Sequence, residues 1–453
     1  MAHLSEGEVG AFAAGTLDPA AWHKVVRHLL TGCTQCRERL GASAPFLFFE
    51  ETPPSQAEIS DDVYDAALDR AFVSARQFEQ RWNEQRRLAS EVLPFVTKDP
   101  ARGVRAVPRQ KRESAFGWPL VEALLQASFE ERFRDPKRMV TLAHQACSVA
   151  NATQEGSYPP GFVSDLRARA SAEFANAYRV QERFGKAEEA LASAYEHYEG
   201  GTQEQALLGL MLEVEASLRR AQRRIPETLA ILSRACDLYL EMGERHLAGR
   251  TMISKGLAFY ANREAAKAVQ CLEQGLSLID RSQDPQVVTT AYQSLIGALV
   301  DCREFRRAGE LLLESGLRQA FSAEPLNLLR LRWVEGQIHA GLGRLAKAEH
   351  AFQEVRDGFR DHDLEYDAAL AGLDLAAVWL RQGDIRKVHQ LASQMLMTFR
   401  VVGVRTEAFK AMQLLETSCE ERAVTLSIVQ GIRAFLDRLQ FEPHLTVEES
   451  LVI

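Results

Sequence analysis

Six segments of this chain carry one pattern at an almost constant spacing, and this repetition constrains the fold more than any other feature. Each segment is anchored on a small or β-branched residue that opens the second helix of a unit. The anchors are Ala187, Thr228, Ala268, Ala308, Ala348 and Val388, with steps of 41, 40, 40, 40 and 40 residues. Apolar or small residues recur three positions before and four positions after each anchor. Such a period with helical spacing predicts an all-α solenoid of helix-turn-helix repeats.

A second recurring position lies twelve residues before each anchor, in the first helix of the unit. It holds Ala175, Ala216, Gly256, Ile296, Gly336 and Ala376. We expect the first helix to let its partner approach closely at this position, because most of these side chains are small. A degenerate unit is predicted before the series, around Ala143, Cys147 and Ala150, and a closing helix after it, with Ile428, Ile432 and Phe435.

The first unit resembles the tetratricopeptide repeat family. The resemblance rests on Phe174-Ala175-Asn176-Ala177-Tyr178 and on Arg183-Phe184-Gly185-Lys186-Ala187. It implies a tetratricopeptide-like solenoid over residues 116–440, followed by a tail at 441–453. The 40-residue period exceeds the family's usual 34 residues, which implies longer helices.

The same resemblance implies a partner-binding groove lined by the first helix of each unit. Carried over unit by unit, the family's groove positions fall on Asn176, Arg179, Arg220, Arg250, Tyr260, Gln293, Arg330, Trp333 and Gln337. Arginines predominate among the charged members of this set. The groove is therefore expected to favour an acidic or carboxylate-bearing protein segment.

A cluster of metal-binding side chains lies near the N-terminus. His28, Cys33 and Cys36 form a His-x4-Cys-x2-Cys motif in which Gly32 ends the helix that carries the histidine. The turn between the cysteines aims two thiolates at one point, as tetrahedral Zn²⁺ requires. We choose His3 as the fourth ligand, because a short helix and a turn would return the N-terminus to this place. His23 is the alternative, although it points away from the His28 face of the helix.

Residues 1–40 resemble the zinc-binding domain of the anti-sigma factor family, and we expect the zinc-binding module to span residues 1–42. The matching elements are His3, the apolar helix from Val9 to Ala13, the turn from Gly15 to Ala20 and the His28-to-Cys36 motif. The family usually has three residues between the histidine and the first cysteine, whereas this chain has four. The resemblance implies a sigma factor as partner, held by residues 1–95. The simpler alternative is that the zinc is purely structural and stabilises a segment that is too small to fold alone.

Residues 43–115 read as a linker with one amphipathic helix at about 61–93 and a basic loop at 98–112. The helix presents an apolar stripe, at Tyr64, Leu68, Phe72, Ala75 and Phe78. This stripe is predicted to fold back on the first repeat, with a partner surface as the alternative. The loop has six basic residues, at Lys98, Arg102, Arg105, Arg109, Lys111 and Arg112. A solvated loop is the preferred interpretation, because the stretch has no interleaved aromatic residues or base-reading motif.

Composition and missing motifs narrow the class of function. No run of eighteen apolar residues occurs, and the first residues lack the regions of a signal peptide, so a cytoplasmic protein is expected. A net charge of −8 argues against wholesale nucleic-acid binding. The phosphate-loop, dinucleotide-binding, nucleophile-elbow and zinc-protease motifs are all missing from the sequence.

The sequence therefore predicts a non-enzymatic bacterial regulatory or adaptor protein. In this hypothesis an anti-sigma-like zinc module controls a sigma factor or another transcription or signalling partner, while the solenoid binds a second protein. The alternative is a plain interaction scaffold with structural zinc. Direct nucleic-acid binding through residues 98–112 is a third and more distant possibility.

Overall fold

The computed structural model describes residues 4–13, 17, 19–30, 36, 80, 82–99, 102–108, 112, 115–402, 405–440, 442 and 444–447. The chain divides into two compact units, Met1–Leu124 and Leu125–Ile453, and each is described by itself. The described residues form helices and turns without a strand. None of the described helices combines the length and the apolar sequence needed to span a bilayer.

In the first unit, α1 (Glu6–Ala13) contacts α2 (Pro19–Leu30). Residues 82–98 are helical, and the ring of Trp82 meets that of Trp118 with centroids 5.5 Å apart. Trp118 begins α6 (Trp118–Glu130), which contributes residues to both units. The predicted apolar stripe from Tyr64 to Phe78 lies outside the described residues.

Part of the predicted basic loop folds on itself. Residues Gly103–Ala106 form a short 3₁₀ helix, η3. The Arg112 guanidinium donates to the carbonyl oxygens of Val107 and Arg105, each at 2.8 Å. Arg112 therefore organises the backbone of the loop.

The second unit continues from α6 into α7 (Pro136–Ala152), which places Ala143 and Ala150 in the core as the degenerate unit predicts. The Asp135 carboxylate caps α7 by accepting from the Lys137 and Arg138 amides, both at 3.0 Å. Pro136 follows at the first helical position, where its missing N–H leaves no hydrogen bond unmade.

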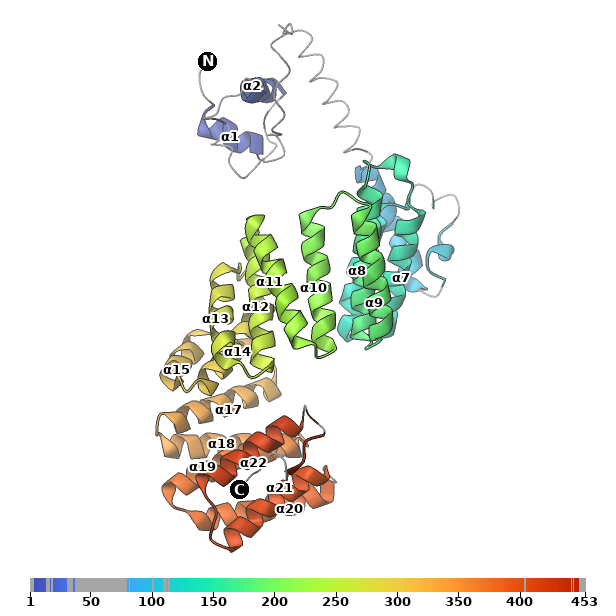
Figure 1. The fold of residues 1–453 in the computed structure, drawn as a ribbon. Coiled ribbons are helices and arrows are strands. Elements are labelled where there is room, and N and C mark those ends of the chain that lie inside the picture. Colours follow the sequence, from blue (N-terminus) through green and yellow to red (C-terminus); the bar gives the residue numbers. More distant parts are fainter. Residues whose placement is uncertain are drawn as a thin grey trace. The chain divides into compact units, whose positions relative to one another are not determined.

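Six helical hairpins follow, and Figure 1 shows their helices stacked in chain order. They are α8 (Phe162–Val180) with α9 (Phe184–Glu199), α10 (Gln205–Ala221) with α11 (Ile225–Glu241), α12 (Arg245–Ala261) with α13 (Ala265–Leu278), α14 (Pro285–Asp301) with α15 (Phe305–Glu314), α17 (Pro325–Gly341) with α18 (Leu345–Asp361), and α19 (Glu365–Gln382) with α20 (Ile385–Val402). The predicted all-α solenoid of helix-turn-helix units is confirmed. All six anchor residues are buried.

The second helix of the fourth hairpin is shorter than the pattern predicts. α15 ends at Glu314, and Gly316 adopts a φ of 67° before α16 (Leu317–Ala320) begins. Glycine reaches this left-handed conformation without a Cβ clash, so the chain turns here. Leu317 and Phe321 are buried and extend the hydrophobic core beyond the turn.

The turn inside each hairpin has one recurring geometry. The residue two places before the second helix has a positive φ in all six hairpins, at Glu182, Arg223, Arg263, Arg303, Gly343 and Gly383. In the third hairpin the Arg263 amide donates to the Tyr260 carbonyl and the Glu264 amide to the Phe259 carbonyl. Equivalent bonds recur in the other five. This Schellman motif satisfies carbonyls that the end of the first helix leaves free.

The paired helices approach closely where the pattern places a glycine. A Cβ atom on Gly336 would lie 2.6 Å from Cε1 of Phe352, and one on Gly256 would lie 2.7 Å from Cγ of Leu272. No real Cβ tolerates such distances, so both positions require glycine for this helix spacing. By contrast, a Cβ on Gly185 would meet no atom within 4 Å.

The chain closes with α21 (Thr406–Glu420) and α22 (Leu426–Leu439). The predicted closing helix is present, but it packs on α19, a first helix, as well as on α21 (Figure 1). Its apolar side is buried, at Val429, Ile432, Phe435, Leu436 and Leu439. Part of the predicted tail also packs on this core, because the Val447 amide donates to Glu407 at 2.8 Å. α22 thus lies on the layer of first helices.

The close helix approach predicts a difference between two glycine variants. Gly336→Ala should lower the free energy of unfolding by about 1–3 kcal/mol, because its methyl group meets the Phe352 ring. Gly185→Ala should leave this free energy unchanged or slightly raised, because alanine has the higher helix propensity and the space is open. Urea unfolding followed by circular dichroism compares the two. Equal midpoints would show that the small positions do not set the helix spacing.

Candidate functional site

Two of the predicted zinc ligands, His28 and Cys36, meet in the first unit. The His28 Nε2 atom lies 3.3 Å from the Cys36 Sγ atom, and the two residues are 8% and 0% exposed. The Leu4 amide donates to the same sulfur at 3.4 Å, so the residue that follows His3 reaches this place. Leu4, Val25 and Cys36 form a small hydrophobic core.

The spacing of this pair fits a shared zinc ion. Zinc binds histidine nitrogen at about 2.0–2.1 Å and cysteine sulfur at about 2.3 Å, so tetrahedral geometry places the two atoms about 3.5 Å apart. His3 and Cys33 lie outside the described residues, and the alternative ligand His23 lies in α2. Among the residues that the structure describes, no group of three or more His, Cys, Asp and Glu side chains is placed to hold a metal.

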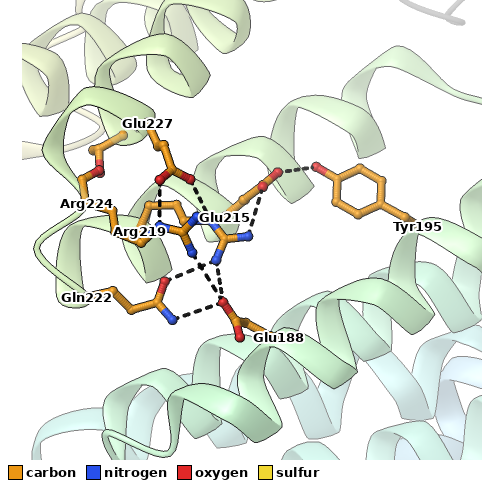
Figure 2. Close-up of polar contacts among 8 residues, drawn as sticks. Glu188, Tyr195, Glu215, Arg219, Gln222, Arg224 and Glu227 are labelled. Atoms are coloured by element: carbon orange, nitrogen blue, oxygen red, sulfur yellow. Dashed lines mark hydrogen bonds and ion pairs between the residues drawn. The ribbon is translucent and has the colours of Figure 1, made fainter.

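A different site builds up on the solenoid around two neighbouring arginines of α10. The Arg219 guanidinium faces three carboxylates (Figure 2). It lies 2.6 Å from Glu188 on α9, 3.6 Å from Glu215 on α10 and 3.8 Å from Glu227 on α11. Gln222 donates to Glu188 as well, at 3.1 Å. The charge of Arg219 is therefore used to join the first two hairpins.

Arg220 has the opposite surroundings. Its side chain is exposed and has no hydrogen bond or ion pair with a described residue. Burial lowers the pKa of Arg179 on α8, and the nearby charge of Arg220 lowers it further. Arg179 donates to Oδ1 of Asn176 at 3.1 and 2.8 Å. Three predicted groove residues, Asn176, Arg179 and Arg220, thus form one site, the Arg179–Arg220 site, with one half-buried and one exposed positive charge.

Three other predicted groove residues lie in different surroundings. The Arg250 guanidinium donates to Glu213 at 2.6 Å, so its charge is neutralised within the solenoid. Arg330 is exposed and donates to Asn327 at 3.3 Å. Gln293 is half-buried on α14.

Trp333 and Gln337 meet at the carboxylate of Asp374. Trp333 Nε1 and Gln337 Nε2 donate to Oδ2 at 2.7 and 3.2 Å. Arg433 of α22 donates from Nε to Oδ1 at 2.6 Å and lies over the Trp333 ring, 5.9 Å from its centroid. One carboxylate therefore ties α17, α19 and α22 together.

Tyr260 lies near the other end of α22. It packs on α14, because a Cβ atom on Gly297 would lie 2.4 Å from its hydroxyl oxygen. Burial raises the pKa of Tyr260 to about 12, and Asp301 contributes to the increase. Arg263 forms an ion pair with Asp437 of α22. α22 therefore reaches from the sixth hairpin back to the turn of the third.

The pattern did not predict Asp374 or Arg433. Asp374 had a detectable signal, because it is the only charged residue in the apolar run of residues 368–380. A lone carboxylate in such a run needs a partner when the helix is buried. Arg433 had no comparable signal, because it lies on an amphipathic helix that carries a second arginine, Arg438.

Comparisons with known proteins give a likeness of fold alone. No family model and no curated protein matches the chain. Among solved structures, the apo form of RapI has 10% identity and a TM-score of 0.49, covering 72% of this chain and 99% of that one. Aspartyl phosphate phosphatase F from Bacillus subtilis has 12% identity and a TM-score of 0.45, covering 90% and 96%. A STAND protein with a tetratricopeptide repeat sensor from Pyrococcus horikoshii has 14% identity and a TM-score of 0.45, covering 81% of this chain and 50% of that one.

The Asp374 contacts predict that α22 depends on Arg433. Arg433→Gln should lower the free energy of unfolding by about 1–3 kcal/mol, because it removes a charged hydrogen bond from a largely buried carboxylate. Arg438→Gln is the matched control on the same helix, where an exposed pair with Glu442 is lost and little change is expected. The midpoints of urea unfolding compare the stability of the two variants with that of the unmodified protein. A loss for Arg438→Gln as large as that for Arg433→Gln would contradict the assignment.

Proposed function

We propose that this chain is a non-enzymatic bacterial adaptor whose tetratricopeptide-like solenoid, with its 40-residue period, binds an acidic segment of a partner protein at the Arg179–Arg220 site. The observation that carries the proposal is the exposed guanidinium of Arg220, which has no hydrogen bond or ion pair with a described residue and lies near the positive charge of Arg179. Two positive charges near one another repel, and an anionic group bound between them would relieve this repulsion. A carboxylate would supply that negative charge through bidentate hydrogen bonds.

The position of the site supports a protein segment as its ligand. Arg179 and Arg220 come from the first helices of two successive hairpins, which contact one another. Charges repeated along a row of helices suit an extended chain that carries several carboxylates. Asn176 holds the Arg179 guanidinium in place, so less side-chain freedom is lost on binding.

The test uses synthetic peptides. Fluorescent peptides with none to four glutamates in one neutral sequence should bind the full-length protein more tightly as glutamates are added, and salt should weaken the binding. Arg220→Ala should weaken binding of the most acidic peptide about tenfold or more, since a charged hydrogen bond contributes about 1.5–3 kcal/mol. Arg386→Ala is the matched control on the exposed side of α20. The proposal fails if the two variants bind alike or if glutamate content has no effect.

For the N-terminal module we propose structural zinc, held by His28, Cys33 and Cys36 with His3 or His23. The 3.3 Å approach of His28 and Cys36 supports the proposal. Zinc there would supply folding energy to a segment of about forty residues, which is too short to be stabilised by a hydrophobic core alone. This arrangement corresponds to the scaffold hypothesis. A sigma-factor partner for residues 1–95 rests on the resemblance of the first 40 residues alone.

Metal analysis tests the module. The purified protein should contain about one zinc per chain, and Cys36→Ser should remove it while the helical signal of the solenoid persists. Cys147→Ser is the matched control, because Cys147 lies in α7 of the other unit, where burial raises the pKa of its thiol to about 12. Comparing His3→Ala with His23→Ala identifies the fourth ligand. Full zinc occupancy in Cys36→Ser would refute the site.

A further inference from the structure

A cleft of about 590 Å³ lies between α22 and the first helices of the fourth, fifth and sixth hairpins. Leu426 and Val429 of α22 form one wall, and α14, α17 and α19 form the others. The volume falls within the range of small-ligand pockets, about 300–1,000 Å³. A helix of about 10 Å diameter would fill it within about five residues, which is too short for a recognition helix. The cleft therefore suits a small molecule.

The α22 wall of the cleft is fixed in place. Five apolar side chains of the helix are almost fully buried, and Arg433 is held by Asp374. The Tyr366 hydroxyl also donates to the Leu436 carbonyl at 2.7 Å. Moving the helix away would expose this apolar face to water. A ligand would therefore enter a preformed site.

One wall carries a carboxylate without a partner. Asp301 lies at the end of α14 and has no hydrogen bond or ion pair with a described residue. Burial raises the pKa of Asp301, while the charges of Arg263 and Arg433 lower it. The Asp301 side chain is exposed at the cleft, and its carboxylate oxygens are open to hydrogen bonds from a cationic group of a ligand.

Two arginines that line the same cleft have no carboxylate partner. Arg303 makes no side-chain hydrogen bond or ion pair with a described residue. Arg381 donates to the Ala340 carbonyl at 2.7 Å and forms no ion pair with a described residue. Phe305 and Ala377 contribute apolar surface to the same lining. A simple cation would be repelled by the arginines, whereas a molecule with both charges would complement the lining.

We propose that this cleft binds a small molecule that carries both an ammonium group and a carboxylate on an apolar body. Asp301 accepts from the ammonium group, and Arg303 or Arg381 donates to the carboxylate. The apolar body contacts Phe305 and Leu426. Free amino acids and short unblocked peptides share this chemistry, and the experiment separates the two sources.

Isothermal titration calorimetry of the full-length protein tests the proposal with four probes. They are phenylalanine, phenylalanyl-phenylalanine, N-acetylphenylalanine and phenylalanine amide. Phenylalanine or the dipeptide should bind. N-acetylphenylalanine and phenylalanine amide should each bind about tenfold or more weakly than the free probe that binds, because each lacks one of the two charges. Tighter binding of phenylalanine identifies an amino-acid site, and tighter binding of the dipeptide a short-peptide site.

Variants then assign the charges. Asp301→Asn should abolish the difference between the free and N-acetylated probes, and the Arg303→Gln, Arg381→Gln double variant should abolish the difference between the free and amidated ones. Asp237→Asn, an exposed change on α11, is the control and should leave all affinities unchanged. Saturable binding by none of the four probes, equal binding of blocked and free forms, or variants that behave like the control would overturn the proposal.

Discussion

The solenoid depends on the way in which the first helix of each hairpin ends. The Schellman motif fixes the direction in which the chain returns, and the small residue twelve positions before each anchor fixes how near the second helix comes. Together they determine the rotation of each helix about its axis. This rotation directs Arg219 into the contacts between hairpins and leaves Arg220 open to solvent, although the two are adjacent in sequence.

The layer of first helices consequently offers two different chemical environments. Near the ends of α8 and α10, Arg179 and Arg220 place two positive charges close together, and Arg220 has no ion pair with a described residue. Around α14 to α19 positive and negative charges alternate, and Asp374 already holds Arg433 of α22. A partner that binds at the first environment leaves the second intact, because α22 lies only over the later hairpins. Two ligands of different size could therefore be bound by one solenoid without competing.

The fold could be predicted from the sequence to the extent that it depends on local contacts. The anchors were identifiable because a buried small residue in a helix pair is needed once in every unit, and Ala187 and Ala348 are 0% exposed. The position of α22 was not identifiable, because its partners on α19 lie about 60 residues earlier, for example Asp374 and Arg433 with a separation of 59.

Ion pairs within the solenoid determine which of the predicted groove arginines could still bind a partner. Arg220 lies near the end of α10 and has no partner among the described residues, whereas Arg250 lies near the beginning of α12, where Glu213 of α10 neutralises it. The sequence pattern contains no information on that contact. The zinc motif is similar, because its spacing brings His28 to Cys36, while the geometry around His3 and Cys33 lies outside the described residues.

The ion pair between Arg263 and Asp437 joins residues 174 positions apart in a fold whose other contacts are mostly between neighbours. An exposed ion pair of this kind contributes little to the free energy of unfolding by itself. It adds one more contact to α22, a helix whose apolar face is already buried. Repeat proteins otherwise unfold piecewise, one unit after another. Here α22 connects the third hairpin with the sixth, so the opening of a hairpin at this end would also break contacts between residues far apart in the sequence.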